Sequence, residues 1–216
     1  MIISASRRTD IPAFYPDWFF NRIKEGYVLV RNPMNIYQVS RISLLPSVVD
    51  CFVFWTKNPS RMMGRLHLLN NYNFYFQYTI TSYGKSLEPS VPARAETIST
   101  FQSLSDAIGK DRVIWRYDPI ILSDNMDIDY HVAQFDLIAS SLGGYTQRCV
   151  ISFLDLYKKC ERNLKCIKLS DITNADMKSL AQSFKTIAQK YNIEIVTCSE
   201  QIELSSVGIH HGKCID

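Results

Sequence analysis

The chain has 216 residues, of which 46% are hydrophobic and 21% are charged, and its formal net charge is +3 at pH 7. This length and composition fit one globular domain with a proper hydrophobic core. A charge this small excludes a strongly basic nucleic-acid-binding protein as the default class, although residues 1–65 carry nine Lys and Arg against four Asp and Glu.

The cysteine pattern indicates the compartment. Six cysteines are spaced irregularly, and there is neither a signal peptide nor an apolar run long enough to cross a bilayer. Secreted disulfide frameworks do not show this pattern. We therefore expect a reducing, cytoplasmic location, no membrane partner, and thiols that are mostly buried and unpaired.

The first predicted strand is "IISAS" at residues 2–6. A helix follows in "YPDWFFNRIKEG", with Pro16 near its start and Gly26 at its end. The segments "YVLVRNP" and "YQVSRISL" then predict an inserted hairpin around residues 32–35. Five further strands are predicted from β-branched and aromatic runs at 51–56, 73–80, 112–117, 148–154 and 193–198.

Helices are predicted between the later strands. The apolar positions from Ile98 to Ile108 and from Val132 to Leu142 keep the helical period, and a glycine follows each run. The last helix, from Met177 to Tyr191, follows Thr173 and Asp176, a capping pair.

Alternating strands and helices predict parallel pairing through right-handed crossovers. We expect an α/β fold: a partial (β/α)6 TIM-like barrel over residues 1–216, with a small hairpin insertion after the first helix. A doubly wound sheet is the alternative. That fold usually has a glycine-rich phosphate turn after its first strand, whereas "SASRRTDIP" contains no glycine.

Polar side chains follow the predicted strands, and in a barrel these strand ends meet at one mouth. The candidates for substrate or anion binding are Arg7, Arg8, Asp10, Lys57, Arg116, Asp118 and Glu200. Guanidinium groups suit phosphate and carboxylate, so a small-molecule or phosphorylated ligand is the expected partner. The alternative is that these residues form structural ion pairs at the mouth.

Two cysteines are weaker candidates for metal ligands. Cys198 ends the sixth predicted strand, and Cys214 lies in the tail "GIHHGKCID" beside His210 and His211. A set that lacks a fourth ligand is more often an ordinary surface turn. We therefore expect no metal to be held by this chain alone.

Five ordered segments carry a family resemblance: "ISASRRTDIPAFYPDWF", "NP...VSRISL", "VDCFVFWTKNP", "RVIWRYDPIIL" and "CSE...GIHHGKCID". Together, from residue 2 to residue 216, they resemble the DUF1848 family, a bacterial domain of unknown function. That family resembles radical S-adenosylmethionine enzymes, whose core is a (β/α)6 partial barrel, with its cysteine cluster placed after the barrel. The resemblance implies a C-terminal cluster segment beyond "CID", and a 4Fe–4S cluster and S-adenosylmethionine in a full-length protein.

The chain departs from the usual motifs of those enzymes. Cys160 and Cys166 are separated by five residues, and Cys198 and Cys214 by fifteen, so no C-x3-C-x2-C motif is present. No Gly-Gly-Glu motif follows the second predicted strand. We therefore expect a radical S-adenosylmethionine-type barrel that is incomplete in this chain and binds neither cofactor alone.

Two other classes stay open. One is a binding module for an anion, a phosphorylated ligand or, less favoured, a nucleic acid, which would use the basic front half and the aromatic strand ends. The other is a metal-independent hydrolase or lyase. It ranks third because His67 and His131 fall on predicted helices and no paired-carboxylate base is evident.

Overall fold

The computed structural model describes residues 1–6, 8–155, 168–198, 200 and 202–215. The chain divides into two compact units, Met1–Tyr78 and Thr79–Asp216. Arg7, Cys160 and Cys166 lie outside the described residues, as does most of the expected loop at 158–173. None of the described helices combines the length and the apolar character that a membrane crossing requires.

The first unit contains three parallel strands, β1 (Ile2–Ser4), β4 (Cys51–Thr56) and β5 (Phe74–Thr79). Ile2 is paired with Cys51, and Phe52 with Phe74. After β1 come α1 (Ile11–Phe14) and α2 (Pro16–Glu25), while α3 (Ser60–Met63) and the 3-10 helix η1 (Leu66–Leu69) connect β4 to β5.

The predicted hairpin is confirmed. Strands β2 (Tyr27–Asn32) and β3 (Asn35–Ser43) pair antiparallel, with an irregular register at Asn32. Helix α2 ends at Gly26, whose φ of 74° is left-handed and so favours glycine, and the hairpin begins at the next residue.

Aromatic rings fill the core of the first unit. Phe19 on α2 meets Phe52 and Phe54 of β4 edge to face, with ring centroids 5.4 and 5.2 Å apart. Phe54 in turn stacks on Phe76 of β5 at 4.9 Å. These contacts fix α2 against the strands, because paired aromatic rings bury large apolar areas in preferred geometries.

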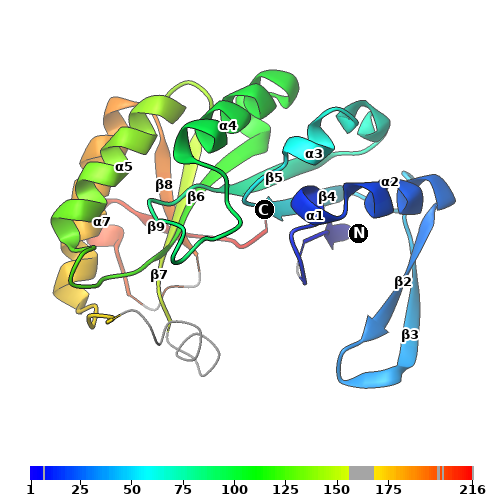
Figure 1. Cartoon of the computed structure of the whole chain (residues 1–216), viewed down its shortest axis with the longest axis horizontal. Coiled ribbons are helices and arrows are strands. Elements are labelled where there is room, and N and C mark those ends of the chain that lie inside the picture. Colours follow the sequence, from blue (N-terminus) through cyan, green and yellow to red (C-terminus); the bar gives the residue numbers. More distant parts are fainter. Residues whose placement is uncertain (7, 156–167, 199, 201, 216) are drawn as a thin grey trace. The chain divides into compact units, whose positions relative to one another are not determined.

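The second unit contains β6 (Val113–Ile120), β7 (Arg148–Phe153), β8 (Glu194–Cys198) and β9 (His210–Gly212), which pair in that order and in parallel. The helices among its described residues are α4 (Arg94–Ile108), α5 (Ile128–Leu142) and α7 (Asn174–Lys190), with short 3-10 helices η2 (Lys110–Arg112) and η3 (Ser205–Val207). Figure 1 shows α5 and α7 side by side against these strands.

A stack of rings joins the helices to β6. Phe135 of α5 and Phe184 of α7 stack at 4.0 Å, Trp115 stacks on Phe135 at 4.7 Å, and Tyr117 meets both phenylalanines edge to face. Because side chains alternate along a strand, Arg116 projects to the opposite face. The helices thus cover one face of β6 and leave the other to polar groups.

Parallel strands alternating with helices confirm the expected α/β fold, and each of the six predicted strands is present. Strand β9 was not expected, because "HHG" lies where we predicted a surface turn. At Gly212 in this strand, an added Cβ would lie 2.8 Å from Cγ2 of Val196, so only glycine fits beside β8 without a shift.

Candidate functional site

In the first unit, Asp10 holds backbone groups. Its Oδ1 accepts a hydrogen bond from the Ala13 amide at 3.0 Å, which caps α1, and its Oδ2 accepts from the Lys57 amide at 2.7 Å. Burial raises the pKa of Asp10 above its ordinary value, although these bonds oppose the shift. Asp10 therefore ties the residues after β1 to those after β4, and Lys57 meets it through its backbone.

Arg8 also has an intramolecular contact. Its Nη2 donates to the carbonyl of Arg31 on the hairpin at 2.9 Å, on an exposed surface. Arg8 and Asp10, neighbours in sequence, are thus bonded to different elements of the first unit. The structure gives each of them a local structural partner.

The second unit brings the other sequence candidates together at the carboxyl ends of its strands. We call this group the edge site and define it as Arg116, Asp118, Ser152, Cys198, Glu200 and Cys214. Arg116 is only 6% exposed. Its Nε and Nη2 lie 2.7 and 2.5 Å from Oδ2 of Asp118, and Ser152 donates its hydroxyl to Oδ1. Both oxygens of Asp118 are therefore used.

Two thiols complete this polar face. The Sγ atoms of Cys198 and Cys214 are 3.1 Å apart, and the side chain of Cys198 also bonds Arg116. Burial alone would lower the pKa of Arg116, but Asp118 and Cys198 outweigh it and raise the pKa. The guanidinium is thus a permanent cation, and thiols beside a cation have the surroundings typical of reactive or metal-binding cysteines.

Glu200 joins β7 to the residues after β8. Its Oε1 accepts from the Phe153 amide at 2.7 Å. Burial raises the pKa of Glu200, and the charges of Asp155 and Asp118 add to the effect, whereas the Phe153 amide opposes it. Of our candidates for the mouth, Arg116, Asp118 and Glu200 therefore lie on adjoining strand ends of one unit.

The histidines of the predicted tail lie in β9. His211 Nδ1 is 3.0 Å from the Thr197 hydroxyl, and Nε2 is 2.8 Å from Glu203 Oε1. Within the described part of the chain, no three His, Cys, Asp or Glu side chains are grouped so as to hold a metal ion. Strand β9 instead explains how Cys214 comes to lie beside Cys198, because β9 pairs with β8.

A buried network of hydrogen bonds was not predicted from the sequence. Ser82 Oγ lies 3.1 Å from Tyr117 Oη, which lies 2.8 Å from His131 Nδ1, and His131 Nε2 lies 2.8 Å from the Ile121 carbonyl. A carbonyl only accepts, so Nε2 carries the proton and Tyr117 donates to Nδ1. Ser82 then donates to Tyr117. Burial lowers the pKa of His131, which keeps the ring neutral.

The sequence feature that could have indicated a buried, hydrogen-bonded His131 is its position on the apolar face of a helix. It lies four residues before Phe135, on the buried stripe of α5, where a histidine must find hydrogen-bond partners. The sequence predicts this helix but not the partners, because Ser82 and Tyr117 come from distant segments. Its place on a predicted helix counts against a role as a catalytic base, yet its ring bonds Tyr117 of β6.

The architecture defines an α/β protein with parallel strands and a polar, thiol-containing site at strand ends. The chain matches the family model described as Domain of unknown function (DUF1848) over residues 2–216, and it belongs to that family. No curated protein matches it. Among solved structures, the chain is similar to a putative alpha-L-fucosidase from Bacteroides thetaiotaomicron VPI-5482, with 10% identity, a TM-score of 0.38, and coverage of 94% of this chain and 75% of that one. A likeness this low supports no inference.

Proposed function

We propose that this chain forms the partial (β/α)6 barrel of a radical S-adenosylmethionine-type enzyme, and that the edge site is part of its active site. The observation that carries the proposal is the thiol pair, with Cys198 and Cys214 Sγ atoms 3.1 Å apart beside the buried Arg116. Barrel enzymes hold their active sites at the carboxyl ends of strands, and thiolates are the ligands of iron–sulfur clusters.

The described residues supply part of a cluster site. A 4Fe–4S cluster takes more than two cysteine thiolates, whereas the described residues bring together two. The ligand set within the described residues is therefore incomplete. Cys198 and Cys214 are proposed as two ligands, to be joined by cysteines outside the described residues.

The other edge-site groups favour a zwitterionic ligand. Arg116 is a fixed cation that suits a carboxylate, while Glu200 and Asp118 suit an ammonium group. S-adenosylmethionine carries both groups on its methionine part. Asp118 already neutralises Arg116, so a ligand carboxylate would have to share the guanidinium with Asp118. A simple anion would add an unbalanced negative charge here, whereas the ammonium group of a zwitterion would offset that charge.

The test uses the longest natural gene product that contains this chain, assembled anaerobically with iron and sulfide. Bound iron and visible absorbance are measured for the natural protein and for the variants Cys198→Ser, Cys214→Ser and Cys51→Ser. Cys51 lies on β4 in the first unit and serves as the matched control. We expect iron to fall in the first two variants and to persist in the third. A colourless natural protein would contradict the proposal that the protein binds a cluster. Equal iron in all three variants would contradict the proposal that Cys198 and Cys214 are ligands.

A further inference from the structure

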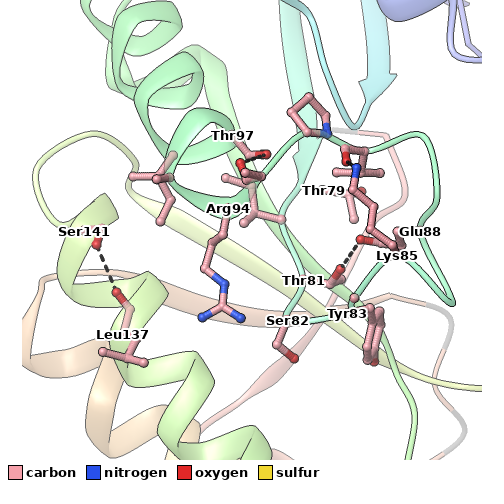
Figure 2. A pocket seen from close by; sticks show the side chains of 17 residues that line it. Thr79, Thr81, Ser82, Tyr83, Lys85, Glu88, Arg94, Thr97, Leu137 and Ser141 are labelled. Atoms are coloured by element: carbon pink, nitrogen blue, oxygen red, sulfur yellow. Dashed lines mark hydrogen bonds between the residues drawn. The ribbon is translucent and has the colours of Figure 1, made fainter.

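The second unit contains a cavity of about 600 Å³ that is separate from the edge site. Its walls are Thr79 at the end of β5, residues 80–85 that follow it, the segment that leads into α4, the first turn of that helix, and Leu137 and Ser141 on α5. Figure 2 shows Arg94 extending from the start of α4 into this hollow, towards the side where Ser82 lies. A cavity of this size fits a small organic ligand.

Arg94 supplies the charge of the cavity. Among the described residues its side chain forms neither a hydrogen bond nor an ion pair. Burial raises the pKa of the Tyr117 phenol, and the positive charge of Arg94 opposes this shift. The other charged lining groups are engaged: Lys85 Nζ donates to the carbonyls of Pro89 and Val91, and Glu88 accepts from the Thr81 hydroxyl at 2.9 Å. Arg94 is therefore the charged lining group that is available to contact a bound ligand.

Backbone donors lie at the same end of the cavity. Helix α4 is 15 residues long, and its N-cap is Ala93, which has no side chain that could accept from the first-turn amides. The residues Arg94 and Ala95 of this turn line the cavity. Amides at the start of a helix and a guanidinium both favour negatively charged oxygen.

Part of the remaining wall is apolar, and this part would contact the body of the ligand. It is formed by Ile80, Val91, Pro92, Ile98 and Leu137, while hydroxyl-bearing residues such as Ser82, Tyr83 and Ser141 also line the cavity. A bare inorganic anion would leave this surface uncovered. The lining thus matches a molecule with an anionic head and an apolar or ring-shaped body.

We propose that this cavity binds a small organic oxyanion, a phosphate ester or a carboxylate, whose charged oxygens meet Arg94 and the first turn of α4. Its body lies against Val91, Pro92 and Leu137. This site uses none of the edge-site residues, so it stands independently of the enzyme class proposed above.

The test is titration calorimetry on the whole chain with four probes. Phenyl phosphate and phenylacetate each combine a ring with an anionic group, a phosphate in the first and a carboxylate in the second. Phenol supplies the ring without a full charge, and inorganic phosphate supplies the anionic group without a ring. We expect saturable binding of phenyl phosphate or phenylacetate, at least about tenfold tighter than phenol or inorganic phosphate, since a charge-assisted contact adds that much. Which of the two charged probes binds identifies the head.

Variants locate the site. Arg94→Gln should weaken binding of the charged probe about tenfold or more, and Arg94→Lys less, because it keeps the charge but loses the planar fork. Lys190→Gln removes the same charge from the exposed end of α7 and should bind as the natural chain does. Because Arg94 is exposed, these variants are expected to fold, which circular dichroism checks. Unchanged affinity in Arg94→Gln, or no saturable binding of either charged probe, overturns the proposal.

Discussion

At the scale of single residues, Arg116 is a charge that the second unit buries almost completely. Taking a charge out of water costs several kcal/mol unless it is paired and hydrogen-bonded, and Asp118 together with Ser152 meets that requirement. The Arg116–Asp118 ion pair also keeps the guanidinium in place beside Cys198. Arg116 is therefore a positioning residue for the thiols.

Replacing Arg116 with Met should lower the free energy of unfolding by about 3 kcal/mol, because Asp118 is left in a largely buried place without its cation. Arg148 forms a more exposed pair with Glu194 at 3.3 Å, and Arg148→Met should cost below about 1 kcal/mol. Urea unfolding of both variants measures the difference. Equal losses would show that Arg116 is not stabilised by a buried pair.

The raised pKa of Glu200 makes stability depend on pH. The folded chain holds the Glu200 proton more readily than the unfolded chain, whose pKa is near the ordinary 4.5. Its stabilising contribution is therefore present at acidic pH and is lost as the pH rises from there through the raised pKa.

Glu200→Gln removes this titration. We expect the unfolding free energy of the natural chain, minus that of Glu200→Gln, to decrease as the pH rises through this window. Denaturant unfolding of both proteins at several pH values gives the difference, in which the other carboxyl groups cancel. A difference that stays constant, or that increases with pH, would contradict the assignment.

At the scale of elements, α5 connects β6 to α7 in the second unit. Its buried stripe includes His131, which bonds Tyr117 of β6, and Phe135, which stacks on Trp115 and Phe184. The helix begins after Asp127, whose Oδ1 accepts from the Tyr130 amide at 2.8 Å. This cap fixes the turn from which His131 projects.

Asp127→Ala should lower the free energy of unfolding by about 1 kcal/mol, because the first-turn amide loses its acceptor. Asp127→Asn keeps an acceptor oxygen and is the matched control, with a loss expected to be a few tenths of that. Thermal unfolding followed by circular dichroism compares them. If Asn costs as much as Ala, the charge rather than the cap is what matters.

The elements that could be predicted are those with a strong local signal. The helix α7 has a complete capping box between Thr173 and Asp176, and its apolar face repeats over 17 residues. Strand β9 has three residues and no alternating pattern, so only pairing with β8 reveals it. The short helix α1 was not predicted, whereas the first predicted helix, which starts at Tyr15 and Pro16, corresponds to α2.

The candidate sites also divide into one that local sequence patterns predict and one that they do not. Arg116 and Asp118 could be predicted because they stand at alternate positions near the end of a buried strand, which puts both on one face. The cavity at Arg94 could not, because its wall combines α4 and α5 with a segment that has neither helix nor strand. Such a surface exists only once long-range packing is complete.

At the scale of the whole molecule, charge pairing argues against nucleic-acid binding. The net charge is only +3, and several cations face carboxylates, among them Arg65 with Asp17 and Lys168 with Asp124. Nucleic-acid binding needs many cations to displace counterions from phosphates, which makes it fall steeply with salt.

We expect a labelled single-stranded oligonucleotide with unphosphorylated ends to show no appreciable binding at low or at physiological ionic strength. Fluorescence anisotropy at the two salt concentrations measures this. Tight binding at low salt that weakens steeply at the higher concentration would contradict the expectation and favour the binding-module class.

The burial of Trp115 has an optical consequence. Its indole is fully buried, stacked on Phe135, and donates from Nε1 to the Ile80 carbonyl at 3.0 Å, whereas Trp18 in the first unit is 45% exposed. Emission from Trp115 should therefore lie at shorter wavelength and resist quenching by iodide, while Trp18 should be quenched readily. Trp115 is the tryptophan of the second unit, whereas Trp18 and the half-buried Trp55 lie in the first. A shift of the short-wavelength, iodide-resistant emission to longer wavelength therefore reports that the second unit has opened to water.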